Sequence, residues 1–263
     1  MKYLKKIIPK FIKARLKNLN KNQKYEFGTH NRSYFKYDFV GVEKLIKNFS
    51  QCFQDIFVLT VLNGKKEGTY LEIGSSHPIK INNTYLLEKQ YGWSGIGIEL
   101  NKEMSLVYSD LRQNPVLNLD ALKFDYLSLY KYFPDKTIDY LQIDIEPAQF
   151  NLEVLKKIPF EFFNIKVITF ETDLYVSSEN EHYAEQSRNY LQDKNFKLVK
   201  KNIKFNNHIF EDWYIHNDYF DHTNSICAFE ENIDGNEIFF TNLNFNEKLL
   251  SFAKYIFKLN PRL

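Results

Sequence analysis

Small and acidic residues end two short apolar stretches of the chain, and their types and spacing suit the binding of a nucleoside. Residues 70–76 read YLEIGSS and residues 96–99 read IGIE, so Glu99 follows Gly74 by 25 positions. A glycine at a strand end lets the backbone approach a ligand, and an acidic side chain one βαβ crossover later accepts hydrogen bonds from ribose hydroxyls. The alternative is an ordinary turn at Gly74 beside a Glu99 that caps a helix.

The residues after Gly74 narrow the choice of nucleoside. The next four residues are SSHP, where a dinucleotide fingerprint needs two further glycines, so NAD is disfavoured. The chain also contains no G-x-x-x-x-G-K-[ST] loop, which disfavours ATP or GTP hydrolysis. S-adenosylmethionine carries no phosphate. It needs one close backbone approach and a carboxylate for its ribose, and the sequence offers both.

Four carboxylates follow two later apolar stretches and could serve a methyl acceptor: Asp144, Glu146, Glu171 and Asp173. The ends of adjacent parallel strands bring such residues together. Methyl transfer to a hydroxyl is an in-line displacement, which needs alignment and a group that takes the hydroxyl proton. Clustered carboxylates repel, so they need a cation, a shared proton or a hydroxyl-rich ligand.

Three readings of this cluster stay open. Asp144, Glu171 and Asp173 are candidate ligands of Mg²⁺ or Ca²⁺. A metal-free site would instead use a carboxylate or a histidine as the base, and the third reading gives these residues capping roles only.

Histidines and aromatic residues supply further candidates. The candidate imidazole bases are His182, His208 and His216, and His208 is favoured because it stands just before the sequence FEDW. Trp213 and Tyr214 suit stacking on a sugar face, with core packing as the alternative.

An alternating framework of strands and helices is needed to position these residues. Apolar stretches predict strands over 69–73, 95–100, near 116, 138–143, 165–170, 196–205, 209–215 and 226–229. Helical spacing predicts helices over 42–61 (one or two), 83–91, 102–113, 146–157 with Pro147 in its first turn, 182–193 and 245–256. Such alternation indicates βαβ units and a doubly wound, mostly parallel sheet. The strands over 209–215 and 226–229 are expected to form an antiparallel edge.

The composition fits one large α/β domain. The chain has 263 residues, 44% hydrophobic and 26% charged, which excludes collagen-like, disordered and disulfide-rich classes. Cys52 and Cys227, 175 positions apart, form no disulfide framework and no zinc pattern, which suits a reducing compartment. No run of 18 apolar residues occurs, and Pro9-Lys10 interrupts the apolar run that a secretory signal needs, so we expect a cytoplasmic protein.

The N-terminal segment differs from the rest of the chain in its charge. Residues 1–24 hold nine basic residues and no acidic one, which leaves 26 basic against 33 acidic residues elsewhere. A globally basic nucleic-acid binder is therefore not expected. Apolar residues between positions 4 and 19 recur at helical spacing, which predicts a basic amphipathic helix that binds an anionic membrane surface peripherally. Docking on this protein or a partner, and disorder, are the alternatives. We expect residues 1–40 to form this helix and a linker, and residues 41–263 to form the domain.

Several stretches resemble the FkbM family of S-adenosylmethionine-dependent methyltransferases. They are GTYLEIGSSHP, NNTYLLEKQYGWSGIGIEL, DYLQIDIEPAQ and VITFETDLY, and Ser50-Gln51 and Gln54-Asp55 precede them. The later FEDWY resembles a segment of the glycan-modifying members. The resemblance spans roughly residues 50–216 and implies a class I, Rossmann-like methyltransferase fold that O-methylates sugars of surface polysaccharides or natural products. The chain departs from the family at Pro147, Ser76 and Pro78, where glycines are usual.

The resemblance also implies roles for individual residues. Those expected at the cofactor are Glu72, Gly74 and Ser75 along the methionine half, Glu99 at the ribose, Asp120 and Ala121 near the adenine, and Asp144 near the reacting methyl group. Gln54 and Asp55, on the helix expected before the first strand, are placed to close over the cofactor or are ordinary surface groups.

We therefore expect an O-methyltransferase that acts on a sugar or sugar nucleotide of a bacterial surface polysaccharide, such as a capsule or lipopolysaccharide. Its candidate catalytic residues are Asp144, Glu171 and His208, and its candidate substrate residues are Glu146, Asp173, Trp213, Tyr214 and Gln54. Residues 1–24 would hold it near the inner membrane. An N-methyltransferase of a small amine and a non-catalytic scaffold of the same fold are the alternatives.

Overall fold

The computed structural model describes residues 35–45 and 47–240. The predicted N-terminal basic helix and the predicted helix over 245–256 lie outside the described residues, so the proposed division of the chain stays a prediction. Cys52 and Cys227 are buried free thiols. None of the helices in the described ranges combines the length and apolarity needed to cross a membrane.

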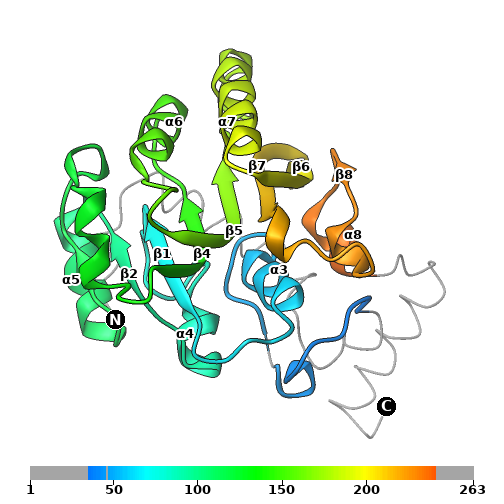
Figure 1. The fold of residues 1–263 in the computed structure, drawn as a ribbon, viewed down its shortest axis with the longest axis horizontal. Helices are drawn as coiled ribbons and strands as arrows, with labels where there is room; N and C mark the ends of the chain where they lie inside the picture. The colour runs from blue at the N-terminus through cyan, green and yellow to red at the C-terminus, as the bar shows by residue number, and fades with distance from the viewer. Residues whose placement is uncertain (1–34, 46, 241–263) are drawn as a thin grey trace, which may run out of the picture.

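A single mixed sheet runs through the described part of the chain (Figure 1). Its strands lie in the order β3-β2-β1-β4-β5-β7-β6-β8. Their bounds are β1 Thr69–Ile73, β2 Ser94–Ile98, β3 Val116–Leu117, β4 Thr137–Ile143, β5 Asn164–Glu171, β6 Phe196–Phe205, β7 His208–His216 and β8 Glu230–Glu231. Strands β3 to β5 pair in parallel, and β7 runs antiparallel to both β5 and β6. This confirms the mostly parallel, doubly wound sheet, with its antiparallel strand inserted next to β5.

Helices cover both faces of this sheet. Their bounds are α3 Gln54–Val61, α4 Tyr85–Tyr91, α5 Lys102–Leu111, α6 Ala148–Lys157, α7 Glu181–Asp193 and α8 Gly235–Phe239. Short 3-10 turns span Val42–Lys44, Ala121–Lys123, Tyr126–Lys131, Ser178–Asn180, Asn217–Tyr219 and Ser225–Cys227.

Two apolar cores result, one on each face. The first packs α3, α4 and α8 against side chains such as Tyr70 and Trp213, and the second packs α6 and α7 against side chains such as Leu71 and Ile143. Successive strand residues point to opposite faces, so the near-continuous apolar strands in the middle of the sheet supply both cores.

Three expected elements differ from the structure. The predicted strand over 226–229 is wrong, because Ile226 and Cys227 are buried in a 3-10 turn, and the short strand β8 follows it in parallel with β6. The helix predicted over 42–61 forms a 3-10 turn at its start, and α3 begins only at Gln54, after Phe53 takes the left-handed conformation (φ 67°). Helix α6 begins at Ala148, because Pro147 is extended (ψ 165°) and occupies the N-cap position just before the first helical residue.

Candidate functional site

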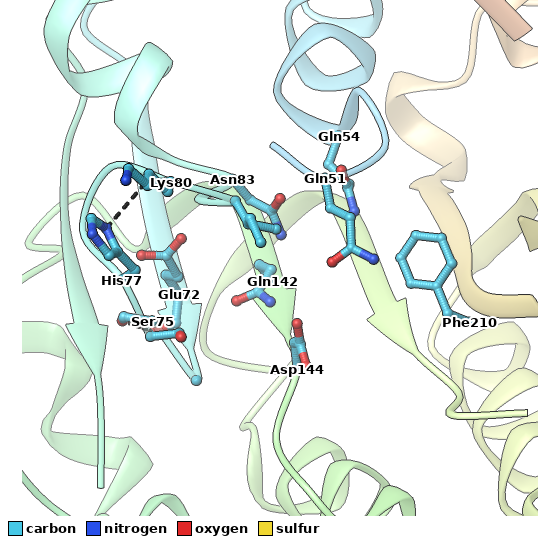
Figure 2. Close-up of a pocket in the computed structure, with 13 residues that line it drawn as sticks. Gln51, Gln54, Glu72, Ser75, His77, Lys80, Asn83, Gln142, Asp144 and Phe210 are labelled. Carbon is cyan, nitrogen blue, oxygen red and sulfur yellow. Dashed lines mark hydrogen bonds between the residues drawn. The ribbon is translucent and has the colours of Figure 1, made fainter. Parts of the chain in front are cut away.

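A cleft lies at the carboxyl ends of β1 and β4, the point where the order of the parallel strands reverses (Figure 2). Such switch points are where ligands bind in open α/β sheets. The lining residues are Gln51, Gln54, Glu72, Gly74, Ser75, Ser76, His77, Lys80, Ile81, Asn83, Gln142, Asp144 and Phe210.

Glu72, near the end of β1, presents a buried carboxyl group to this cleft. It is 2% exposed, and its Oε2 accepts hydrogen bonds from Asn82 Nδ2 over 3.2 Å and from the Tyr108 hydroxyl over 3.4 Å. Burial raises the pKa of Glu72 to about 7, although Arg112 and these hydrogen bonds act in the opposite direction. Glu72 is therefore partly protonated near neutral pH, and a cationic ligand would favour its charged form.

Gly74 brings the ends of β1 and β4 together. Its φ is 85°, and a Cβ at this position would overlap the carbonyl oxygen of Asp144. The amides of Gly74 and Ser75 both donate to the carbonyl of Ile98, over 2.9 and 3.2 Å, so they are not free to bind a ligand. Gly74 and Ser75 do line the cleft.

Glu99 follows β2 and holds the turn after β1. Its Oε2 accepts from the amide of Ser76 and its Oε1 from the amide of Asn101, each over 2.7 Å. An ionised carboxylate has about four lone-pair positions. Each oxygen therefore keeps capacity for one further donor, as a ribose diol requires.

Asp120 and Ala121 follow β3. Asp120 Oδ1 accepts from the amide of Leu122 over 3.0 Å and so caps the turn Ala121–Lys123. The side chain of Ala121 is 6% exposed and packs in the second core. The side chain of Ala121 is therefore directed into the protein.

Asn151 on α6, which the sequence did not single out, fastens the ends of β4 and β5. Its Oδ1 accepts from the amide of Ile145 over 2.7 Å, and its Nδ2 donates to the carbonyl of Glu171 over 3.1 Å. Asp144 lines the cleft, while Glu171 and Asp173 are each 2% exposed and Glu146 is exposed outside the lining.

The structure does not assemble the predicted metal ligands. Within residues 35–45 and 47–240, no three His, Cys, Asp or Glu side chains converge closely enough to hold a metal ion. Asp144, Glu171 and Asp173 come from the ends of neighbouring strands, as expected, but they do not form a ligand set.

Glu211 on β7 is a site residue that the sequence reasoning missed. It pairs with Glu171 across the β5–β7 ladder, so the two side chains share a face of the sheet. Its Oε2 accepts from Gln54 Nε2 and from Trp213 Nε1, both over 2.8 Å. Burial raises the pKa of Glu211 to about 8, and the charge of Asp144 acts in the same direction. Glu211 thus positions Gln54, whose side chain lines the cleft.

The two aromatic residues proposed to bind a sugar lie in the protein core. Trp213 is 0% exposed, and its ring packs on Phe57 with centroids 4.5 Å apart. Tyr214 is buried on the opposite face, where its hydroxyl donates to Asp212 Oδ2 over 3.3 Å. Stacking of either ring on a sugar is therefore excluded.

The three candidate histidines lie outside the cleft lining. His208 is exposed at the start of β7 and contacts the ring of Tyr175. His182 is exposed on α7 beside Gln186, and His216 accepts from the amide of Asp218. The structure therefore does not place an imidazole base from this set at the site.

Asp55 has a structural role, unlike the expected cover over a cofactor. It is 0% exposed, and its carboxylate accepts from the amides of Phe49, Ser50 and Ile56. These bonds fold the segment that carries Gln51 and Gln54 to the cleft.

A buried arginine, which the sequence did not single out, supports the loop after β1. Arg112 donates to Asn82 Oδ1, the carbonyl of Pro78, the Tyr70 hydroxyl and Thr84 Oγ1, each over 3.0 Å, and to Glu88 Oε2 over 2.6 Å. Its side chain and that of Glu88 are 0% and 2% exposed. One guanidinium therefore fixes the loop, the helix α4 and the strand β1 relative to one another.

Comparisons with known proteins give similarity in structure only. No family model matches the chain, and no curated protein matches it in sequence. A candidate rRNA methylase from Clostridium thermocellum has a TM-score of 0.45 at 12% identity, over 64% of this chain and 98% of that one. A candidate caffeoyl-CoA O-methyltransferase from Staphylococcus aureus has a TM-score of 0.44 at 14% identity, over 61% and 80%. Fibrillarin from Aeropyrum pernix, in complex with S-adenosyl-L-methionine, has a TM-score of 0.36 at 12% identity, over 57% and 67%.

Similarity at this level identifies no reaction and no substrate. The resemblance to the FkbM family stays a prediction.

Proposed function

We propose that this chain binds S-adenosylmethionine in the cleft at the ends of β1 and β4 and transfers its methyl group to a hydroxyl of a sugar or sugar nucleotide. The observation that carries the proposal is the placement of Glu99 at the end of β2, beside the switch-point cleft that Gly74 and Asp144 share. A ribose carboxylate and an adjacent close backbone approach are what this cofactor requires.

The charges of the cleft fit the same ligand. Both carboxyl groups in its lining, Glu72 and Asp144, face space that a cation would fill. S-adenosylmethionine carries a sulfonium and an ammonium group, and an opposite charge favours the ionised form of a carboxyl group. Glu99 would bind the ribose, and Asp120 would lie near the base.

When bound, the cofactor supplies an electrophilic methyl group for an in-line displacement. Asp144 is the proposed acceptor of the hydroxyl proton, because its carboxylate lies at the end of β4 and inside the cleft. The side-chain amides of Gln51, Asn83 and Gln142 line the same space. Each can orient a hydroxyl group, because a side-chain amide both donates and accepts hydrogen bonds. Asn151 and Gly74 keep the strand ends aligned for this transfer.

Two features support a sugar as the acceptor. The lining contains several side-chain amides and the hydroxyl groups of Ser75 and Ser76, together with the phenyl ring of Phe210. Amides and hydroxyls form hydrogen bonds with the hydroxyl groups of a polyol. The sequence also resembles the FkbM family, which O-methylates sugars of surface polysaccharides or natural products, and FEDWY resembles a segment of its glycan-modifying members. Residues 1–24 would then bind the inner membrane from the cytoplasm, near glycan assembly. Removing residues 1–24 tests this last point, since it should shift the protein from the membrane fraction to the soluble fraction.

The first test is titration of the protein with S-adenosylhomocysteine. We expect saturable binding, weakened about tenfold or more in Glu99→Ala, a loss of about 1.4 kcal/mol. Glu103→Ala, which removes an exposed carboxylate on α5, is the matched control and should bind normally. Absence of binding by the wild-type protein would contradict the proposal and favour the scaffold.

The second test identifies the acceptor. Release of S-adenosylhomocysteine is measured with panels of sugar nucleotides and of small amines. Turnover with sugars and none with amines supports the O-methyltransferase, whereas the reverse result assigns the chain to the amines. Asp144→Asn should abolish turnover while cofactor binding persists.

A further inference from the structure

Three amides of the turn after β1 are used within the protein. The amides of Gly74 and Ser75 donate to Ile98, and the amide of Ser76 donates to Glu99. The sequence after Gly74 also lacks the glycines that would expose further amides. These three amides are therefore not available to a ligand carboxylate, and the side chains that line the cleft are the donors to consider.

Lys80 and His77 offer such side chains on the same side of the cleft (Figure 2). The amides of Ile79 and Lys80 both donate to His77 Nδ1, over 3.1 Å each. Because Nδ1 accepts these bonds, the ring proton must lie on Nε2, which makes that nitrogen a donor. Burial and the nearby charge of Lys80 hold the pKa of His77 below its ordinary value, so the ring is neutral at pH 7.

The segment that carries these two residues is held in place before any ligand binds. Asn82 anchors it: its Nδ2 donates to Glu72 Oε2 and to the Ser75 carbonyl, and its Oδ1 accepts from the amides of Thr84 and Tyr85. Arg112 adds bonds to Asn82 and to the carbonyl of Pro78. A preformed subsite binds more tightly because little ordering entropy is lost on binding.

The lining carries groups of both kinds, with Lys80 and His77 on the loop after β1 and the carboxyl groups of Glu72 and Asp144 at the strand ends. A zwitterionic amino acid has matching charges at one end. Resting on the proposed function, we infer that Lys80 Nζ and His77 Nε2 bind the carboxylate of the amino-acid end of S-adenosylmethionine, in place of the amides of a glycine-rich turn. The bond from the Lys80 ammonium would be an ion pair as well as a hydrogen bond, and such bonds are stronger than neutral ones.

A pair of ligands that differ only in this carboxylate tests the inference. S-adenosylhomocysteine and its decarboxylated analogue are titrated into the wild-type protein and into Lys80→Met. We expect the substitution to weaken S-adenosylhomocysteine about tenfold, equivalent to about 1.4 kcal/mol, and to leave the analogue within about twofold. Lys80→Arg should keep most of the affinity, and Lys66→Met, an exposed lysine before β1, should change neither ligand.

Each outcome separates this inference from the proposed function. Equal weakening of both ligands by Lys80→Met, or no effect on either, would overturn the carboxylate subsite while the cofactor site stands. Uridine diphosphate is titrated as a third ligand. If Lys80→Met loses uridine diphosphate but binds S-adenosylhomocysteine normally, Lys80 contacts an acceptor phosphate, and the carboxylate subsite is overturned too. If the wild-type protein binds neither S-adenosylhomocysteine nor its decarboxylated analogue, the proposed function is refuted instead.

Discussion

Arg112 donates a hydrogen bond to Asn82 Oδ1 over 3.0 Å, and this bond joins the C-terminal end of α5 to the loop beside the cleft. Asn82 in turn donates to Glu72. The position of a carboxyl group in the candidate site therefore depends on a guanidinium that does not line the cleft. The same guanidinium pairs with Glu88, and both side chains are buried.

The Arg112–Glu88 pair predicts a large and partly recoverable loss of stability. Arg112→Met leaves the Glu88 carboxylate buried without its guanidinium, and we expect the free energy of unfolding to fall by about 3 kcal/mol. Removing both charges in Arg112→Met/Glu88→Gln should restore part of this loss. Urea unfolding measures both variants, and a double variant less stable than the single one would contradict the prediction.

Without added ligand, the free energy of unfolding should fall as the pH rises through neutrality. Burial raises the pKa of Glu72 from 4.5 to about 7 and that of Glu211 from 4.5 to about 8. Between the ordinary value of 4.5 and these raised values, the folded protein keeps protons that the unfolded chain has released. The free energy of unfolding therefore declines with rising pH in this range. Each group contributes a slope of at most about 1.4 kcal/mol per pH unit. Above the folded-state pKa values this contribution is fully lost.

Neutral variants check the assignment of this slope. Glu72→Gln and Glu211→Gln should each give a flatter dependence of unfolding free energy on pH between 5 and 8 than the wild type. The exposed Glu103 on α5 supplies the control, because Glu103→Gln should leave the slope unchanged. Curves of wild type and Glu72→Gln that run parallel would show that Glu72 titrates normally.

Binding of a cationic ligand should release a proton from Glu72. A positive charge beside this carboxyl group lowers its pKa from about 7, so affinity for S-adenosylmethionine should rise with pH up to about 7 and then level off. Calorimetry at pH 6.5 in phosphate and in Tris reports the released proton as a difference in apparent enthalpy. Equal enthalpies in the two buffers would contradict the prediction, and Glu72→Gln should remove the difference.

Much of the framework could be predicted from sequence because apolar periodicity is strong in its strands. The strands over 69–73 and 196–205 have the predicted bounds, and Gly74 and Glu99 lie at the strand ends as expected. The strand predicted over 226–229 failed because Ile226 and Cys227 are apolar for a different reason: they fill a core from a turn.

The parts of the site that sequence reasoning missed depend on long-range pairing. Arg112 is a single basic residue at a helix end, and its partners lie 24 to 42 positions away. Glu211 and Trp213 are two residues apart on β7, so their side chains lie on the same face of the sheet. Only the contacts of this face with Phe57 and Gln54 on α3 show that it is closed to solvent. In a chain with 24 Phe and 18 Tyr, aromatic character alone does not distinguish a sugar platform from a core.

Asn151 should affect methyl transfer more than cofactor binding. Its side chain bridges the amide of Ile145, next to Asp144, and the carbonyl of Glu171, and it is 0% exposed. Asn151→Ala leaves a buried amide and a buried carbonyl without this partner, so we expect a loss of about 2 kcal/mol in unfolding free energy. The exposed Asn217, which pairs with Asn195, gives the control: Asn217→Ala should cost less than about 0.5 kcal/mol.

The kinetic consequence of Asn151→Ala follows from where it acts. The ends of β4 and β5 carry the proposed proton acceptor, whereas the ribose carboxylate of Glu99 follows β2, on the other side of β1. We therefore expect kcat to fall about tenfold or more, since small misplacements of reacting groups cost that much, with the affinity for S-adenosylhomocysteine within about twofold of wild type. Both are measured well below the unfolding temperature. A parallel loss of kcat and cofactor affinity would mean that Asn151 supports the whole cleft, and an unchanged kcat would mean that the ends of β4 and β5 hold Asp144 without it.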